Sequence, residues 1–160
     1  MEVILSDFAR MSLAELGMAL RESRIRAAEV LEFCASRRDE ELRAYRVWDQ
    51  EGATRQAQTA DAALACGADP GPLCGVPVSV KDIFGVAGFE TFAGSPKPLP
   101  EKWTREGPLV REMRGQLCTI VGKTHTVEFA FSGLGANPHW GTPLNPRGRE
   151  ASARSRRVYF

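Results

Sequence analysis

Residues 75 to 82 read Gly75-Val76-Pro77-Val78-Ser79-Val80-Lys81-Asp82, and this stretch decides the fold of the 160-residue chain. Its valines alternate with Pro77 and Ser79, a period of two that predicts a strand with one apolar face. Proline and glycine residues before and after the stretch mark turns. The sequence therefore predicts a short, dry strand that ends on a lysine.

Lys81 is the candidate catalytic residue. Partial removal of a lysine from water disfavours its ammonium form, lowers the pKa of the amine and makes the amine usable as a base. We therefore expect the side chain of Lys81 to be largely buried, with its amine facing a cavity. The alternative from these eight residues alone is a surface lysine paired with Asp82.

The rest of the chain predicts an α/β protein. Caps and apolar periodicity predict helices that begin after Ser12 and that cover residues 26–38, 50–66 and 106–114; alternation and apolar runs predict strands at 42–48 and 117–121; prolines and glycines predict loops at 67–72, 84–103 and 133–146. The lysine strand, a helix and a second strand follow one another, an order that favours parallel pairing in an α/β layer.

A set of short motifs accompanies the lysine strand. They are Thr91-x-x-Gly94-Ser95, Gly122-Lys123-Thr124, Glu128-Phe129-Ala130, Gly135-x-Asn137 and Gly141-Thr142-Pro143-x-Asn145-Pro146. In this order, the set resembles the amidase signature family from near Ser12, strongly from Gly71 to Pro146, and stops at Arg147. The resemblance implies the N-terminal part of the amidase signature α/β/α fold, with a mixed sheet preceded by N-terminal helices.

The resemblance also implies an activity, the hydrolysis of carboxylic amides by a Ser–cis-Ser–Lys mechanism. It assigns Lys81 as the base and implies no cofactor and no metal; it assigns no substrate-binding residue here. The family's serines lie in and after a glycine-rich loop that follows Asn145-Pro146. Ser152 and Ser155 fall near that place but lack flanking glycines, so the family's serines are not carried onto them.

The last fourteen residues, 147 to 160, hold five arginines and one glutamate. We expect two parts: residues 1–146 as the N-terminal portion of an amidase domain, and residues 147–160 as a non-homologous, disordered tail. A frameshift in GC-rich coding DNA would explain such a tail. Without a nucleophile and an oxyanion loop we expect an inactive fragment, whose strand at 117–121 and whose lysine strand both lack a neighbour.

Composition excludes several classes of function. The net charge is +1, no zinc spacing of cysteines and histidines occurs, and the basic tail lacks aromatic interleaving, so we expect no metal and no nucleic-acid partner. A phosphate loop around Lys123 requires glycine at position 117, which is leucine. We found neither a signal peptide nor an apolar run of membrane length, which favours a cytoplasmic protein without a membrane partner.

Several polar residues near the motifs keep two interpretations. His125 replaces the family's usual asparagine, and either bonds substrate or a neighbouring loop or packs at a strand end. Thr124 and Glu128 are interpreted as partners of backbone groups. Gly133, Gly135 and Asn137 suit positive-φ backbone in a loop that lines the site.

Two functional alternatives stay open. One is the glutamine-hydrolysing, A-type component of a tRNA amidotransferase. The other is a non-catalytic binding or regulatory module derived from the fold. The expected partner is a small-molecule amide if the protein is complete. A homodimer, a missing C-terminal part, and a separate chain that supplies the serines are left open.

Overall fold

A computed structural model describes the chain except residues 1–7, 9, 147 and 153–160. The elements are α1 (Leu13–Arg21), α2 (Ala27–Ser36), η2 (Glu40–Leu42), β1 (Tyr45–Trp48), α3 (Gln50–Ala65), β2 (Pro77–Lys81), η3 (Glu101–Thr104), α4 (Pro108–Gly115), β3 (Thr119–Thr124), η4 (Glu128–Ala130), β4 (Leu144–Asn145) and β5 (Gly148–Ser152). They fall into two compact units. One unit holds Asp49–Ser79 and Arg111–Val121 with the N-terminal helices, and the other holds Asp39–Trp48, Val80–Val110 and the chain from Gly122.

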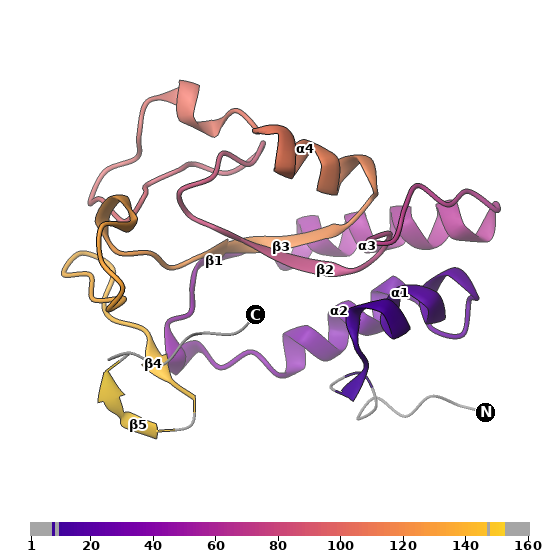
Figure 1. The fold of residues 1–160 in the computed structure, drawn as a ribbon, viewed down its shortest axis with the longest axis horizontal. Helices are drawn as coiled ribbons and strands as arrows, with labels where there is room; N and C mark the ends of the chain where they lie inside the picture. The colour runs from indigo at the N-terminus through magenta and orange to yellow at the C-terminus, as the bar shows by residue number, and fades with distance from the viewer. Residues whose placement is uncertain (1–7, 9, 147, 153–160) are drawn as a thin grey trace. The chain divides into compact units, whose positions relative to one another are not determined.

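The main sheet is mixed and has the strand order β1-β3-β2 (Figure 1). β1 runs antiparallel to β3, with Val47 opposite Lys123. β2 runs parallel to β3, because the Thr119 amide donates to the Val76 carbonyl and the Asp82 amide to the Thr124 carbonyl. The α/β class, the mixed sheet and the parallel pairing are thus confirmed.

β3 lies in the middle of this sheet and is buried along its whole length. The prediction that the strand near residues 117–121 lacks a neighbour is therefore wrong. Beyond the end of β1, the side-chain amide of Gln56 donates to the Ile120 carbonyl at 3.2 Å and accepts from the Ile120 amide at 3.1 Å. A glutamine side chain thus continues the hydrogen bonding of β1, so both backbone edges of β3 have partners.

The helices of the first unit begin at side-chain caps. The Ser12 hydroxyl accepts from the Glu15 amide, and the Glu15 carboxylate accepts from the Ser12 amide, as the capping box predicts. Asp61 of α3 accepts from the first amides of α2, at Ala27 and Ala28. This bond between helices joins α2 to α3 and satisfies donors that a helix start leaves open.

The core of the first unit is built from small and branched side chains. α3 contributes a stripe of buried alanines, which lets α2 pack closely against it. The buried apolar residues of this unit include Leu20, Val30, Leu31, Ala53, Ala57, Ala60, Val76 and Ile120. Because β2 and β3 both reach into this unit, its packing fixes the strands whose far ends carry the motif residues.

The second unit consists largely of loops around the ends of β2 and β3. Val80, Val86, Phe92, Val110 and Val127 are buried there. β4 pairs with the backbone of β5, which covers residues 148–152 of the expected tail. Residues 147 and 153–160 lie outside the described residues, so the division of the chain at residue 146 stays a prediction.

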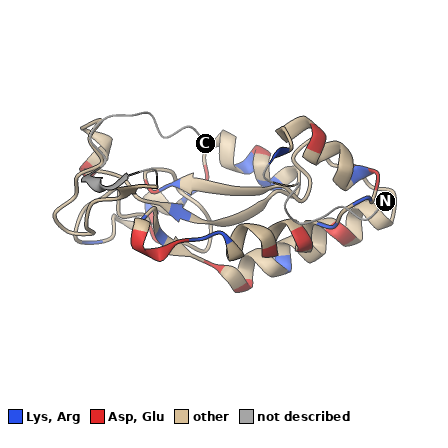
Figure 2. Cartoon of the chain, turned by 90° about the horizontal axis from the view of Figure 1, so that it is seen from below, with Lys and Arg blue, Asp and Glu red and all other residues tan. Residues whose placement is uncertain are grey.

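No helix in the described part of the chain is long and apolar enough to cross a membrane. Acidic and basic residues are interspersed along the helices (Figure 2), in keeping with the net charge of +1. Within the described residues, no group of three or more histidine, cysteine or acidic side chains is placed to hold a metal ion.

Candidate active site

Lys81 is the last residue of β2, as predicted, but its side chain is exposed. The expectation of a largely buried amine is wrong for this chain. Alternation along the strand gives the reason: Val80 is buried, and Lys81 falls on the opposite face, which it shares with Ser79. The valines that make the strand dry therefore do not cover the lysine.

The pairing of Lys81 with Asp82 is wrong as well. Asp82 continues the covered face of Val80 and is only 1% exposed. Its Oδ2 lies 2.8 Å from Arg46 Nε and its Oδ1 lies 2.9 Å from Lys123 Nζ. The carboxylate is therefore engaged by two cations from the neighbouring strands β1 and β3.

Lys123 is completely buried and is held by oxygen atoms. Besides Asp82, its amine donates to the Thr91 hydroxyl at 3.0 Å and to the Glu90 carbonyl at 3.4 Å. Burial lowers the pKa of Lys123 below the usual lysine value and Arg46 lowers it further, whereas the bond to and the charge of Asp82 act to raise it. The ion pair is thus what allows an ammonium in this dry position.

Arg46 joins the ion pair to aromatic rings of the same unit. Its guanidinium lies 4.3 Å from the centre of the Phe92 ring and 5.9 Å from that of Trp140, and these two rings contact each other edge to face. Its Nη2 donates to the Glu90 carbonyl at 2.9 Å. We call Arg46, Asp82 and Lys123 the ion cluster; with one carboxylate and two cations it carries a net charge of +1.

Asn137 ties the loop after η4 to the loop that contains Thr91 and Ser95. Its buried side-chain amide donates to the Gly94 carbonyl at 2.7 Å and to the Thr126 carbonyl at 3.0 Å. Trp140 adds a bond from its indole nitrogen to the Ser95 carbonyl at 2.8 Å. The motifs that lie far apart in sequence thus meet near the end of β2.

The expectation of positive-φ backbone holds for Gly135, at φ 69°, but not for Gly133 or Asn137. Asn137 is instead a hydrogen-bonding residue, whose Oδ1 also accepts from the amides of His139 and Trp140. Two residues that sequence reasoning did not single out, Phe129 and Ala130, have φ values of 48° and 56°. This region of backbone is unfavourable for such side chains, so surrounding contacts hold the turn in place.

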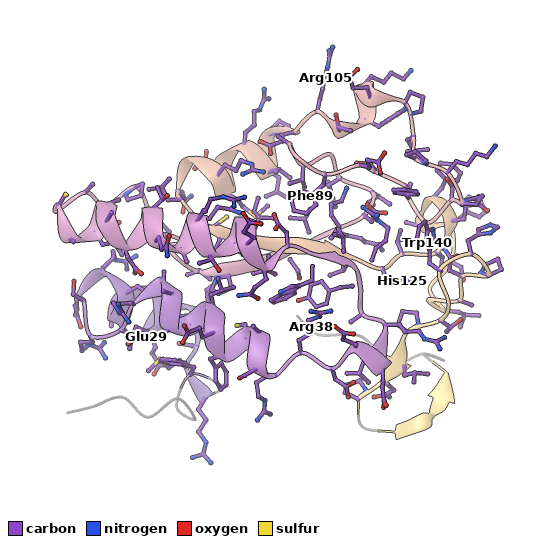
Figure 3. The ribbon with its side chains drawn as sticks, turned by 180° about the vertical axis from the view of Figure 1, so that it is seen from behind. Glu29, Arg38, Phe89, Arg105, His125 and Trp140 are labelled. Atoms are coloured by element: carbon purple, nitrogen blue, oxygen red, sulfur yellow. The ribbon has the colours of Figure 1, made fainter. Side chains whose placement is uncertain are left out.

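His125 follows β3 and is half-buried. One ring nitrogen, Nε2, lies 3.2 Å from the Gly135 carbonyl oxygen, so of its two interpretations the structure shows a bond to a neighbouring loop. Burial lowers the pKa of His125, opposed by the bond to Gly135 and by the charge of Asp82. Figure 3 labels His125 and Trp140 on the segments that follow β3.

The ion cluster is the feature that the sequence analysis missed. One signal for it was available: residues 76, 78, 80 and 82 share a face, so Asp82 prolongs an apolar series. A carboxylate on a covered face requires a cationic partner. Nothing local indicates that the partners are Arg46 and Lys123, because they come from other strands.

Comparison with known proteins bears on this arrangement. The model of the family described as Amidase matches residues 29–153 of the chain. This chain belongs to the amidase family. The motif set around β2, β3 and the loops of the ion cluster is therefore that of an amidase-family protein, as the resemblance implied.

Similar proteins of this family are much longer than the chain. The 2-amino-5-chloromuconic acid deaminase of Comamonas testosteroni is 50% identical over 141 residues, which cover 86% of this chain and 30% of that protein. An amidase of Pseudomonas putida is 34% identical, covering 89% of the chain and 30% of the relative. The A-type component of the glutamyl-tRNA(Gln) amidotransferase of Streptomyces coelicolor is 31% identical, with shares of 89% and 29%.

A solved structure shows the same fold. The crystal structure of an amidase superposes with a TM-score of 0.82 at 31% identity, covering 89% of this chain and 33% of that one. This amidase-family chain thus spans about a third of the length of the relatives that it matches.

Proposed function

We propose that this chain carries the lysine base of a hydrolase that cleaves the C–N bond of carboxylic amides by a Ser–cis-Ser–Lys mechanism. The observation that carries the proposal is the place of Lys81: it ends β2, it is exposed, and the neighbouring carboxylate of Asp82 is engaged by other cations. Within the described residues, no hydrogen bond or ion pair occupies the Lys81 side chain. Its amine is therefore available to accept a proton.

In this mechanism the neutral amine takes a proton from a bridging serine, which takes one from the nucleophilic serine as that serine attacks the amide carbonyl. Backbone amides that stabilise the resulting oxyanion contribute ~2.7–4 kcal/mol each. We propose that the polypeptide that supplies the serines and these amides also covers Lys81. Neither Ser152 nor Ser155 is assigned a role.

A chimera tests the role of Lys81. Residues 1–146 are joined to the part of the Comamonas testosteroni deaminase that this chain does not match, and ammonia release from amides and from that enzyme's substrate is measured. Lys81→Ala is expected to abolish turnover with the fold intact, because the change removes the base and no core volume. Lys97→Ala, an exposed lysine outside β2, is the matched control. Turnover that survives Lys81→Ala contradicts the proposal.

The second candidate is the deamination of an aminomuconic-type dicarboxylic acid. The identity of 50% to a 2-amino-5-chloromuconic acid deaminase, against 34% to an amidase, favours it. The coding DNA after residue 160 identifies the protein to assay. Ammonia release from 2-aminomuconate, a simple carboxamide and glutamine then separates deaminase, amidase and amidotransferase-type activity, and tight binding of a second polypeptide without turnover supports a binding module.

The 160-residue chain alone is expected to have no measurable amidase activity. We propose a small-molecule substrate, and both candidate reactions require a nucleophile and an oxyanion loop that the assigned residues do not include. A sensitive assay of ammonia release with purified chain checks this. Hydrolysis that disappears in Lys81→Ala would instead indicate that Ser152 or Ser155 acts as nucleophile.

A further inference from the structure

The ion cluster is adjacent to Lys81 in the chain but faces the other way. Asp82 lies on the covered face with Val80, whereas Lys81 is exposed on the opposite face. We propose that Arg46, Asp82 and Lys123 are positioning residues for Lys81. They hold the end of β2 from its covered face, and their two cations engage the carboxylate that would otherwise pair with the Lys81 ammonium.

Asp82 is fixed through every polar group that it has. Its backbone amide donates to the Thr124 carbonyl at 3.1 Å, and its carbonyl accepts from the Ala93 amide at 2.9 Å. Its Oδ2 accepts from the Phe92 amide at 3.3 Å as well as facing Arg46. Strand ends fray when such partners are missing. Here the residue after Lys81 is anchored to β3 and to the loop, so the backbone of Lys81 is held on both sides.

The charges of the ion cluster act in the direction that a base needs. A lone carboxylate next to a lysine favours the ammonium form, whereas a nearby cation favours the neutral amine. With two cations around one carboxylate, the surplus charge next to Lys81 is positive. The catalytic value of this arrangement rests on the proposed function, but its effect on the reactivity of Lys81 does not.

The chain allows a direct test because it contains only four lysines, at 81, 97, 102 and 123. Limited acylation of the 160-residue chain at pH 8, followed by mass-spectrometric peptide mapping, gives the rate for each amine. We expect Lys97 and Lys102, both exposed, to react, and the buried Lys123 to be protected. The quantity of interest is the ratio of the Lys81 rate to the Lys97 rate.

Lys123→Met keeps most of the side-chain volume and removes one cation, which leaves the ion cluster neutral. At low ionic strength the Lys81 to Lys97 ratio is expected to fall about two- to fivefold, because the loss of a nearby positive charge favours the ammonium form. In 1 M salt the difference is expected to vanish, since exposed charges are screened. A purely structural role would give no such salt dependence.

Two further variants keep the test decisive. Thr91→Val removes the hydroxyl that accepts from Lys123 without changing a charge, and the ratio is expected to stay the same. Arg46→Met removes the other cation, is expected to lower the ratio like Lys123→Met, and replaces that variant if it fails to fold. An unchanged ratio in both cation variants, or a change that persists in 1 M salt, overturns the proposal, as does rapid labelling of Lys123 in the wild type. Because labelling requires no turnover, an inactive enzyme contradicts the proposed function alone.

Discussion

At the scale of single residues, the stability of the ion cluster depends on its one carboxylate. Asp82→Asn leaves Arg46 and Lys123 as buried cations without a counter-charge, and removing one partner of a buried pair typically costs ~3–5 kcal/mol. Lys123→Met leaves a balanced Arg46–Asp82 pair and is expected to cost much less. Urea unfolding of both variants, followed by circular dichroism, is expected to rank Asp82→Asn as far more damaging.

The control for this ranking is Asp69→Asn. Asp69 lies 3.7 Å from Arg21 in an exposed pair, and such pairs contribute ~0–1 kcal/mol. Equal effects of Asp69→Asn and Asp82→Asn would mean that water reaches the ion cluster and screens it.

His125 makes the stability of the chain depend on pH. Its folded pKa lies below the ordinary value of 6.5, first because of burial. The unfolded chain therefore binds more protons than the folded chain below pH 6.5, and the free energy of unfolding falls as the pH drops from 7.5 to 5.5. Urea midpoints across this range are expected to decrease in the wild type and to be flatter in His125→Gln. His139→Gln, which changes the exposed histidine, is expected to keep the wild-type slope.

At the scale of elements, the loop that carries Thr91 and Ser95 depends on Gly94. Its φ is +76°, and an added Cβ would lie 2.6 Å from the Val127 backbone. Gly94→Ala is therefore expected to destabilise this loop by more than ~1 kcal/mol and to break the Trp140 indole bond to Ser95. Faster hydrogen exchange of that indole proton measures the loss.

Gly133→Ala is the matched control, because no atom lies within 4 Å of its added Cβ and its backbone is not in the positive-φ region. Indole exchange at the wild-type rate in Gly94→Ala would show that the loop adapts without strain.

The elements also show how far sequence patterns reach. The capping box at Ser12 and the alanine-rich helix after Asp49 were predicted within one or two residues, because both signals are local. The strand predicted at 117–121 extends to Thr124. The extension was missed because Lys123 reads as polar loop in isolation, and only Asp82 on the neighbouring strand makes its burial favourable. Likewise, the end of β2 was predictable, but the side on which Lys81 lies required attention to alternation as well as to the valines.

At the scale of the whole molecule, uncovered apolar side chains determine how the chain behaves in solution. Phe129, Phe131 and Leu134 are exposed within one short segment, and Phe131 is 95% exposed. Burial of such a side chain contributes ~1.5–3 kcal/mol, while a domain is stable by only ~5–15 kcal/mol. We predict that the purified 160-residue chain is marginally stable and self-associates through this segment.

Phe131→Lys tests that prediction, because it replaces the most exposed ring by a charge. Ala136→Lys adds the same charge at an exposed position a few residues away and removes no large apolar surface. Sedimentation over a concentration series is expected to show an association constant at least about tenfold weaker for Phe131→Lys and nearly unchanged for Ala136→Lys. If the wild type is instead a monomer with a cooperative thermal transition, and the amides of β2 and β3 resist hydrogen exchange, then these 160 residues form a self-sufficient domain. The exposed rings would then be tolerated surface residues that stability does not require to be covered.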